Sequence, residues 1–494
     1  MIYLSEFVQI RLFQEKYYRK LVTFMNRKQY RLDRAKGMIR AAEGLLEIFI
    51  LVMVYYIIWR KGYRPLGFPR YNGNGKYVLA GVYGLLTMIL FINFDAFKFG
   101  YLKKVDLFLS QVLALFFVNF ITYWQLGLIA EFVLPLGPIS LIMGIDIVLA
   151  LFFTSVYSSL YHWLYTPKNM VMIYGSRESV ALKFKMETRK DKYKLSKLIS
   201  AEEGLEKICQ QLGDYDAVVI NGVEGQLRND LLKFCYRRAI RTYVAPKISD
   251  IIVRGASEIN LFDTPLLLVR GRALSYPQRI VKRAFDLVVC SIALVVASPF
   301  MLIIAIAIKL EDGGPVFFKQ KRATYDGRTF DILKFRSMIV DAEKYGHSIP
   351  ATEKDPRITK VGNVIRAIRF DELPQLLNII KGDMSIVGPR PERVEHMEAY
   401  SKEVPEFDFR LKVKGGLTGY AQIYGKYNTS PYDKLRMDLM YVENYSFFND
   451  LKLILMTLRI LLKKESTEGF DKIEELERQT QEILEEMDQE KTNV

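Results

Sequence analysis

Two adjacent carboxylates, Asp371 and Glu372, are the residues of this chain with the clearest capacity for chemistry. They follow Arg366 and Arg369 and precede Pro374, a residue type that is common in the first turn of a helix. Neighbouring acids beside arginines can hold a hard cation such as Mg²⁺, or one acid can take a phosphoryl group covalently. The alternative is a pair of acids placed at a helix start for the macrodipole, an effect worth less than about 1 kcal/mol.

A proline-framed arginine follows these acids in the chain. Pro389 and Pro391 fix the backbone on either side of Arg390. A guanidinium presented from such a stiff turn can grip a phosphate with two parallel hydrogen bonds. A turn with only a structural role is the alternative.

Two further cations, Lys334 and Arg336, stand on alternate positions around Phe335. They fit either a phosphate contact or a solvated edge strand, and this motif by itself does not decide between the two.

The segment that must carry these groups begins with an interrupted apolar run, Leu287 to Ile308, which holds no charged residue. Ser298 and Pro299 lie near its centre, and a proline removes one backbone hydrogen bond and disturbs the preceding turn. Cations both precede and follow the run. Because basic residues favour the cytoplasmic side of a membrane, both flanks can lie there only if the chain enters and leaves by the same membrane face. We therefore predict a re-entrant helix-break-helix hairpin over 282–310, with Ser298 satisfying a freed backbone group. A kinked fifth spanning helix is the alternative.

Four apolar stretches in the first third of the chain are each near the roughly 20 residues that a spanning helix needs. They are Ala42 to Trp59, Tyr77 to Phe94, Val105 to Ile129 and Leu136 to Leu160. We predict a four-helix transmembrane domain over 41–165, preceded by a basic cytoplasmic interfacial arm over 1–40. Asp146 lies inside the fourth stretch, and we interpret it as a polar contact between helices rather than a transport residue.

Residues 168–273 alternate short β-like runs with charged helical stretches, which predicts a small Rossmann-like α/β domain. The β-like runs are Met170 to Tyr174, Ala217 to Asn221, Thr242 to Pro246 and Leu266 to Val269. The first of these runs ends at Tyr174 and is followed by a segment with a single glycine, Gly175. Dinucleotide loops use three glycines to let the backbone approach a pyrophosphate. A degenerate domain with a structural or regulatory role is therefore favoured over a cofactor site.

The charge distribution points to a membrane surface rather than to nucleic acid. The chain has a formal charge of +15, and its last 30 residues are strongly acidic. The basic residues flank apolar runs, and no nucleic-acid-binding motif is present. We predict a short acidic helical tail over 471–494. The three scattered cysteines indicate reduced thiols, as expected for a catalytic part that faces a reducing cytoplasm.

The run from Lys282 to about Phe470 strongly resembles the bacterial sugar transferase family, the catalytic module of monotopic phosphoglycosyl transferases. The resemblance covers some two-fifths of the chain. It is carried by Ser298-Pro299, Lys334 to Met338, Asp371-Glu372 followed by Leu373-Pro374-Gln375, Gly382 to Ser385, Pro389-Arg390-Pro391, and Gly416 to Gly419 leading to Ala421-Gln422. The preceding helices and α/β domain resemble the long subclass, which transfers hexose-1-phosphate to a polyprenyl carrier.

This resemblance implies a membrane protein with three parts: a four-helix transmembrane bundle, a Rossmann-like α/β domain, and an α/β catalytic module over 279–470. Asp371 would attack a UDP-sugar and release UMP, and undecaprenyl phosphate would then collect the sugar phosphate. Glu372 would assist Mg²⁺ placement or proton handling, both acids being candidate metal ligands. Arg390, with Arg366, would hold phosphate, while the roles of Lys334 and Arg336 are less defined.

The implied setting is the bacterial inner membrane, with several spanning helices and the catalytic module in the cytoplasm, at the start of capsule, O-antigen or exopolysaccharide synthesis. UDP-glucose and UDP-galactose are the expected donors. Dimerisation and partner docking both remain open as roles for the N-terminal regions. Two other classes were weighed: a membrane-anchored nucleotide-sugar dehydratase or epimerase, which needs the missing glycine loop, and a non-catalytic scaffold for polysaccharide export.

Overall fold

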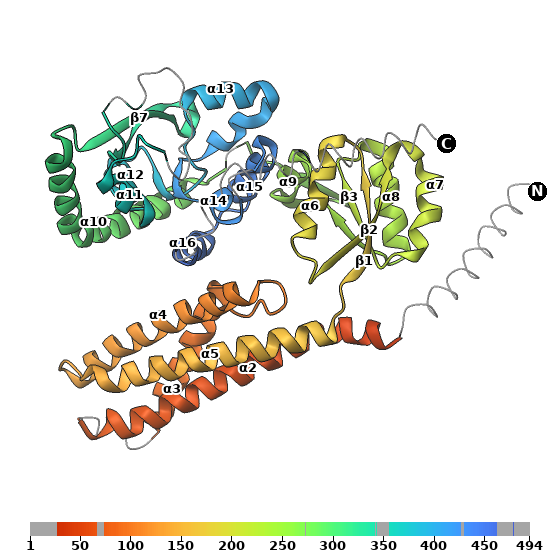
Figure 1. Ribbon diagram of the computed structural model, residues 1–494. Coiled ribbons are helices and arrows are strands. Elements are labelled where there is room, and N and C mark those ends of the chain that lie inside the picture. Colours follow the sequence, from red (N-terminus) through yellow and green to blue (C-terminus); the bar gives the residue numbers. More distant parts are fainter. Residues whose placement is uncertain are drawn as a thin grey trace, which may run out of the picture. The chain divides into compact units, whose positions relative to one another are not determined.

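The computed structural model describes residues 27–66, 74–271, 273–340, 342, 355–425, 429–461 and 478. The chain divides into two compact units, 1–166 and 167–494, each considered separately below (Figure 1). Most of the predicted arm over 1–40 lies outside the described residues, which begin at Arg27. The predicted acidic tail over 471–494 also lies outside them, apart from Arg478.

Long helices make up the first unit, and each overlaps one of the four predicted apolar runs. They are α2 (Arg27–Gly62), α3 (Gly75–Asn93), α4 (Lys104–Ala130) and α5 (Leu136–Leu164), with a 3₁₀ turn η1 (Arg64–Leu66) after α2. Helix α2 also includes residues 27–40 of the predicted arm, so this part of the arm is not separate from the helix. By length and composition all four can cross a bilayer, and so can α10 in the second unit. The chain is therefore a membrane protein in which long apolar helices precede a mixed α/β region.

Asp146 joins three helices of this first unit. Its Oδ2 accepts a hydrogen bond from Asn119 of α4 at 2.8 Å and from the Tyr83 hydroxyl of α3 at 3.1 Å. All three side chains are buried. Asp146 thus makes the polar contact between helices that the sequence predicts, and a second such contact joins Gln111 of α4 to Glu47 of α2.

We expect Asp146→Asn to leave this unit nearly as stable as before, because the amide keeps an oxygen that both donors can reach. Asp146→Leu should cost about 1–2 kcal/mol, because Asn119 and Tyr83 then lose their closest acceptor and keep only longer contacts. Thermal unfolding in detergent measures both variants. If Asp146→Leu were as stable as the unmodified protein, the contact would contribute no stability.

The second unit opens with a parallel sheet in the order β2-β1-β3-β4. Its strands are β1 (Lys168–Tyr174), β2 (Tyr193–Ser200), β3 (Ala217–Asn221) and β4 (Arg241–Val244), connected by α6 (Ala181–Glu187), α7 (Leu205–Gln211) and α8 (Gly225–Arg237). Apolar side chains pack on both faces of the sheet, as expected for parallel strands. Strands β1, β3 and β4 follow the predicted runs, whereas β2 was missed because charged residues interrupt its apolar positions.

Gly175, the glycine that follows β1, has a packing role. A Cβ at this position would lie 2.2 Å from the carbonyl oxygen of Gly222, which follows β3. The Gly175 N–H donates to Asn221 O at 3.0 Å. The two loops at the carboxyl ends of β1 and β3 therefore pack directly on each other. The structural or regulatory role of this domain stays a prediction.

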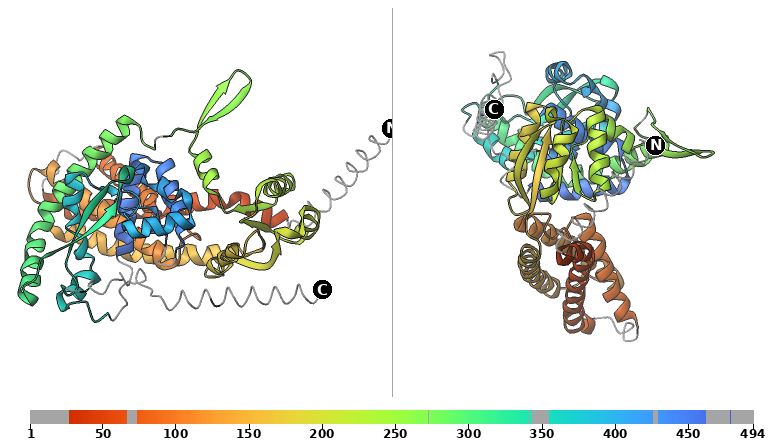
Figure 2. Two further views of the ribbon diagram at one scale, coloured as in Figure 1. Left: turned by 90° about the horizontal axis from the view of Figure 1, so that it is seen from above. Right: turned by 90° about the vertical axis from the view of Figure 1, so that its right-hand side faces the viewer.

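A helix and a hairpin lead from this sheet toward the rest of the unit. Helix α9 (Ile248–Arg254) packs into an apolar cluster with the C-terminal helices, and this cluster includes Ile248, Ile251, Leu435 and Leu439. The hairpin of β5 (Ser257–Leu261) and β6 (Thr264–Leu268) follows, and it projects away from the rest of the unit in both views of Figure 2. The predicted boundary near residue 273 therefore separates segments that belong to one compact unit.

The remaining elements form the C-terminal α/β part. They are α10 (Tyr276–Asp312), β7 (Phe317–Ala323), β8 (Thr329–Phe335), α11 (Lys360–Ala367), η7 (Phe370–Glu372), α12 (Gln375–Lys381), β9 (Ser385–Val387), α13 (Val394–Glu403), η8 (Pro405–Lys412), β10 (Gly416–Thr418), α14 (Tyr420–Tyr424), α15 (Pro431–Glu443) and α16 (Phe447–Leu461). Strands β7 and β8 form an antiparallel hairpin, and β9 and β10 pair in parallel. The main core packs α10, α12, α15 and α16 around these strands.

Helix α10 differs from the predicted helix-break-helix hairpin. It is one continuous helix that contains Pro299, and Figure 1 shows it bending. Proline removes the bond to the carbonyl four residues earlier, which is that of Val295. The Ser298 hydroxyl donates to this carbonyl at 2.8 Å, so the freed acceptor is satisfied as expected. The helix therefore bends at this point without ending.

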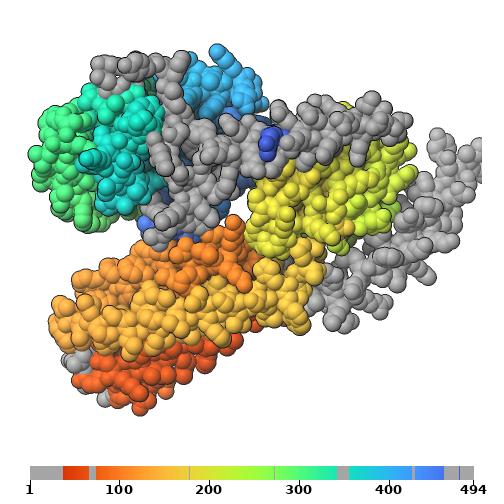
Figure 3. Space-filling view, viewed as in Figure 1, coloured from red at the N-terminus to blue at the C-terminus, as the bar shows by residue number. Residues whose placement is uncertain are grey.

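Both ends of α10 are attached to the same α/β part. Near its start, Lys282 pairs with the buried Asp450 of α16 at 2.5 Å. At its end, Asp312 pairs with Arg336, which follows β8. Large apolar side chains along the middle of the helix are exposed, among them Val295, Val296, Phe300, Leu302 and Ile303. In the space-filling view the helix forms an outer flank beside the segment of α11 and α12 (Figure 3).

Candidate active site

Asp371 and Glu372 lie in the short 3₁₀ turn η7, next to the end of β8. Arg369, which precedes the turn, has a φ of 60°, in the left-handed region that few non-glycine residues adopt. Helix α12 begins only at Gln375, with Pro374 just before it. The acids thus lie near a helix start, as predicted, whereas the prediction that Pro374 lies inside the first turn was wrong by one residue. The left-handed residue reverses the chain and brings the acids back toward β8.

Glu372 is held by two cations. Its Oε1 accepts from Lys334 of β8 at 2.8 Å and from Arg390 at 3.0 Å. Asp371 is held more loosely, with its Oδ2 at 4.0 Å from the Lys334 ammonium. Both carboxylates are largely buried, at 14% exposure for Asp371 and 15% for Glu372. The structure thus brings together four residues that the sequence analysis had singled out in three separate motifs.

The two carboxyl groups differ in acidity because their surroundings differ. Burial raises the pKa of Glu372, but Arg390 and Lys334 outweigh it and hold that pKa well below its usual range. Burial also raises the pKa of Asp371, and Lys334 offsets this effect only in part. The negative charge of Glu372 raises the pKa of Asp371 further, so this pKa stays above its ordinary value. Glu372 is therefore a fixed anion. Asp371 is a buried carboxylate whose oxygens remain available to a ligand.

Asn378 of α12 fixes the distance between the acids and Lys334. Its side-chain oxygen accepts from the Leu333 N–H at 2.9 Å, and its side-chain nitrogen donates to Asp331 O at 2.9 Å. Both bonds go to the backbone of β8, and Asn378 is buried. This amide joins the helix that follows the acids to the strand that carries the lysine.

The turn of Pro389, Arg390 and Pro391 is held at every carbonyl. Pro389 O accepts from the Gly416 N–H at 2.8 Å, Arg390 O from the Arg410 guanidinium at 2.9 Å, and Pro391 O from the Arg322 guanidinium at 3.2 Å. The sequence analysis attributed the stiffness of this turn to its prolines alone. The structure adds two arginines and a strand end that fix the backbone from outside.

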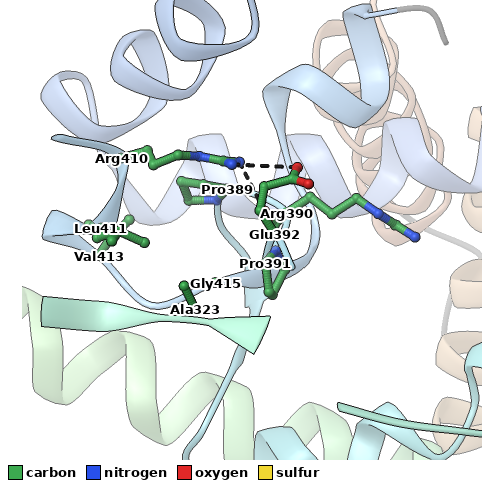
Figure 4. Close-up of a pocket in the computed structure, with 9 residues that line it drawn as sticks. All are labelled: Ala323, Pro389, Arg390, Pro391, Glu392, Arg410, Leu411, Val413 and Gly415. Carbon is green, nitrogen blue, oxygen red and sulfur yellow. Dashed lines mark hydrogen bonds and ion pairs between the residues drawn. The ribbon is translucent and has the colours of Figure 1, made fainter. Parts of the chain in front are cut away.

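Arg410 lies behind the turn in a buried network of charges. It is 1% exposed, pairs with Asp438 at 2.7 Å and lies 3.5 Å from Glu392. Glu392 also pairs with Lys434. Burial raises the pKa of Glu392, but the charges of Lys434 and Arg410 outweigh burial and lower this pKa to about 2. Figure 4 shows Arg410 and Glu392 directed toward each other, while the Arg390 side chain extends away from them. The network therefore supports the turn from behind and leaves the Arg390 guanidinium on the side of Glu372.

The remaining predicted phosphate contacts lie differently. Arg336 pairs with Asp312 at the end of α10 and donates to Pro315 O at 2.7 Å, so its guanidinium is engaged away from the acids. A phosphate contact from Arg336 would require this pair to break. Arg366 of α11 lies close enough to Asp371 to lower the pKa of that carboxyl. Arg366 thus remains a neighbour of the acids, whereas Arg336 anchors α10.

Sequence reasoning missed Arg322, Asn378 and Arg410. Asn378 follows the acid motif closely in the chain, but nothing in the sequence indicates that its side chain bonds to β8. Arg322 and Arg410 are single arginines in basic stretches, where no local pattern separates a buried arginine from a solvated one. Their contacts depend on residues 20 to 69 positions away, which no periodicity reports.

An anionic ligand suits this arrangement. Lys334 and Arg390 bind the same oxygen of Glu372. Arg322 lies behind the turn of Pro389 to Pro391, and burial, followed by the charge of Arg390, lowers the pKa of Arg322 to about 10. A buried carboxylate beside cations can attack an electrophilic phosphorus while the cations offset the charge of the phosphate.

Comparisons with known proteins agree with this chemistry. Residues 277–464 match the bacterial sugar transferase family. Over 191 residues the chain is 39% identical to the exopolysaccharide production protein ExoY of Rhizobium meliloti, in an alignment covering 36% of this chain and 83% of that protein.

Two longer relatives are named for a reaction. The chain is 36% identical over 255 residues to a UDP-N-acetylgalactosamine-undecaprenyl-phosphate N-acetylgalactosaminephosphotransferase of Aeromonas hydrophila, covering 50% of this chain and 59% of the relative. It is 40% identical over 212 residues to a UDP-glucose:undecaprenyl-phosphate glucose-1-phosphate transferase of Escherichia coli K12, covering 42% of this chain and 44% of the relative. The chain thus spans about half the length of these two relatives.

Proposed function

Since the chain belongs to the bacterial sugar transferase family, we propose that it transfers a sugar-1-phosphate from a UDP-sugar to undecaprenyl phosphate and releases UMP. The reaction passes through a covalent intermediate in which Asp371 carries the phosphosugar. The alternatives of a nucleotide-sugar dehydratase and of a non-catalytic scaffold lose their support. The names of the relatives describe phosphotransferases.

The observation that carries this proposal is the division of labour between the two acids. Glu372 is bound by Lys334 at 2.8 Å and by Arg390 at 3.0 Å, which makes it a permanent anchor for two cations. Asp371 also pairs with Lys334, but the distance between its Oδ2 and the ammonium is longer, at 4.0 Å. A nucleophile needs an oxygen that is not already tied to cations. Asp371 meets this need better than Glu372, whose Oε1 accepts from both Lys334 and Arg390.

The proposed reaction has two steps. First, an Asp371 oxygen attacks the phosphorus that bears the sugar; a bond forms between them, and the bond from that phosphorus to the bridging oxygen breaks, so that UMP leaves with the electron pair. Second, an oxygen of undecaprenyl phosphate attacks the same phosphorus, and the carboxylate of Asp371 is restored. Arg390 and Lys334 offset the negative charge that gathers on the phosphate oxygens in both steps.

Mg²⁺ belongs to this proposal as a partner of the diphosphate. Among the described residues no group of three or more His, Cys, Asp or Glu side chains gathers to hold a metal. Mg²⁺ in diphosphate sites is commonly bound through one or two carboxylates together with substrate phosphates and water. Asp371 and the second oxygen of Glu372 fit this donor set. When bound, Mg²⁺ would neutralise charge on the departing UMP.

The re-entrant arrangement of α10 also belongs to the proposal. Lys282 and Asp312, near opposite ends of the helix, both pair with the same α/β part. A spanning helix would separate its ends by the thickness of the bilayer, and one domain cannot bind both. The exposed apolar residues around the bend supply a surface that inserts into one leaflet. The acids then lie at the cytoplasmic face of the inner membrane, where a lipid phosphate and a soluble nucleotide sugar can meet.

We propose UDP-glucose or UDP-galactose as the donor and the start of a capsule, O-antigen or exopolysaccharide unit as the setting. The two longer relatives are named for UDP-glucose and UDP-N-acetylgalactosamine, so N-acetylated donors belong in any panel. A panel of UDP-sugars with undecaprenyl phosphate, measured by UMP release, identifies the donor.

The covalent route is tested with a UDP-sugar labelled at the sugar-bearing phosphate. Without lipid, the purified protein should release no more than one UMP per active site and retain the label. Added undecaprenyl phosphate should then remove the label as lipid-linked sugar phosphate. Turnover without any labelled protein would exclude the intermediate, and a protein that releases no UMP with any donor would exclude the function.

The pH dependence of the first step should follow Asp371. Because the pKa of Asp371 lies above its ordinary value, UMP release should decline on acidification at a higher pH than an exposed aspartate would give. Lys334 lowers this pKa, so Lys334→Met should move the acidic limb to still higher pH. Lys319→Met, an exposed change on β7, is the control and should leave the limb in place. A limb that does not move with Lys334→Met would assign it to another group.

A further inference from the structure

One face of α15 follows the turn of the proline-framed arginine at three points. Lys434, Asp438 and Tyr441 are spaced by four and three positions, so their side chains leave the same side of the helix. The segment that they face runs from Val387, the last residue of β9, through the two prolines to Glu392. Each of the three helix residues is joined to a different point of this segment.

The contacts at the two ends of the segment are direct. Before the turn, the Tyr441 hydroxyl lies 3.1 Å from Val387 O and 2.9 Å from Asp450 Oδ1, and it can donate its proton to either. After the turn, the Lys434 ammonium pairs with Glu392. Tyr441 is 1% exposed and Glu392 is buried. Helix α15 therefore holds the segment both where it enters and where it leaves the turn.

The middle contact passes through Arg410. Its Nη2 lies 2.7 Å from Asp438 Oδ2 and donates to Arg390 O at 2.9 Å. Its guanidinium carbon also lies 4.9 Å from the centre of the buried Phe407 ring. In Figure 4 Arg410 reaches the turn from one side, while the Arg390 side chain leaves the turn on the other. The ion pair and the ring thus fix a donor that holds the backbone of Arg390.

The face of α15 is itself fixed by packing on its neighbours. Leu435 and Leu439, on either side of Asp438 in the chain, are 0% exposed. They belong to the apolar cluster that also contains Ile248 and Ile251 of α9. A rotation of α15 about its axis would pull these leucines out of the cluster. Asp438 therefore occupies a defined position from which it holds the guanidinium.

Stability alone does not account for the ion pair of Arg410 and Asp438. Both side chains are 1% exposed. Taking two charges out of water is costly, and well-packed apolar residues of similar volume often give equal or greater stability. What an apolar residue cannot supply is a donor directed at one carbonyl oxygen of the turn.

We propose that this face of α15 is a template for the turn, and that Arg410 and Asp438 are positioning residues which set the direction of the Arg390 guanidinium. The inference rests on the proposed function, in which Arg390 touches the phosphate, and it deepens the role of that residue. Arg410 and Asp438 act through Arg390 alone. A displacement of about 1 Å in a group that orients the substrate can cost on the order of 10²-fold in rate.

A charge-balanced double variant of the full chain in nanodiscs tests the template. Arg410→Met with Asp438→Leu removes one positive and one negative charge together, so thermal unfolding should stay within a few degrees of that of the unmodified protein. The value of kcat for UMP release should fall by about 10–10²-fold. The control is Arg189→Met with Asp191→Leu, an arginine-aspartate pair between α6 and β2, which should leave kcat unchanged.

Two readouts separate positioning from a general structural role. In a chain that already carries Arg390→Gln, the double variant should cost less than about twofold more, because the group that it positions is gone. A general structural role would lower kcat by the same factor in both chains. Arg390 also lowers the pKa of Glu372, so displacing Arg390 should raise this pKa and add a second protonation step to the acidic limb of the double variant.

Hydrogen exchange provides a readout that needs no activity. The peptide over 387–393 should exchange faster in the double variant than in the control, because the backbone of the turn has lost a donor. If no UDP-sugar gives UMP, the proposed function fails, whereas the exchange of this peptide still decides about the template. Unchanged exchange overturns the proposal, and so does full kcat in the double variant or an undiminished further loss beside Arg390→Gln. Should the double variant unfold, Arg410→Lys, which keeps the charge but not the planar fork, decides by the same comparison.

Discussion

Replacing Asp371 with asparagine is expected to abolish both UMP release and labelling of the protein. The amide keeps the size of the side chain but has no anionic oxygen that can attack phosphorus. Loss of a covalent nucleophile typically costs a factor of about 10⁴ or more in kcat. The measurement is single-turnover UMP release with a labelled UDP-sugar, followed by counting of protein-bound label.

The control for this variant is Asp408→Asn, an exposed change in η8 that should keep full activity. The folded state of Asp371→Asn should be close to that of the unmodified protein, since the ion pair between Asp371 and Lys334 is long, at 4.0 Å. Label that still accumulates on the variant would identify a different nucleophile. Normal turnover of the variant would remove Asp371 from the mechanism.

Replacing Arg390 with glutamine is expected to lower kcat by about 10²–10³-fold, the cost of losing one preorganised charged donor. The guanidinium both holds Glu372 at 3.0 Å and faces the space beside the acids. Arg390→Lys keeps a positive charge but loses the planar fork that binds two oxygens, so it should recover only part of the rate. Steady-state kinetics with saturating lipid give kcat for each variant.

Two further readouts separate a catalytic effect of Arg390 from a loss of fold. Arg254→Lys, an exposed change in α9, should leave kcat unchanged. The positive charge of Arg390 lowers the pKa of Glu372, so Arg390→Gln should raise that pKa and bring a second protonation step into the acidic limb. If Arg390→Lys restored full activity, the turn would supply only charge. If Arg390→Gln were fully active, phosphate would be bound elsewhere.

The elements with a strong periodic or compositional signal were predictable. The four N-terminal helices and α10 follow from long apolar runs, because a bilayer-spanning or bilayer-inserted segment cannot contain many charges. Strands β1, β3 and β4 follow from apolar runs of strand length. Strand β2 and the hairpin strand β5 lack such runs, and pairing with a neighbour, rather than their own composition, makes them strands.

For α10 the sequence predicted the place of the disturbance and the partner that repairs it, but not its extent. Pro299 and the Ser298 hydroxyl are local features, and their bond to Val295 O spans three residues. Whether a helix bends or ends depends on what its two halves pack against. Here both halves pack on one α/β part, which keeps the helix continuous.

The sequence by itself determined the chemical groups of this protein: the neighbouring acids, the proline-framed arginine, the lysine before Phe335 and the apolar segments around them. Short motifs carry this information because a residue's charge and a proline's backbone do not depend on distant contacts. Only the tertiary structure decided which acid is clamped, that Arg336 is committed to Asp312, and that Arg322 and Arg410 hold the turn. Each of these facts is a contact between residues at least 18 positions apart. The energy of a buried charge depends on such partners rather than on its neighbours in the chain.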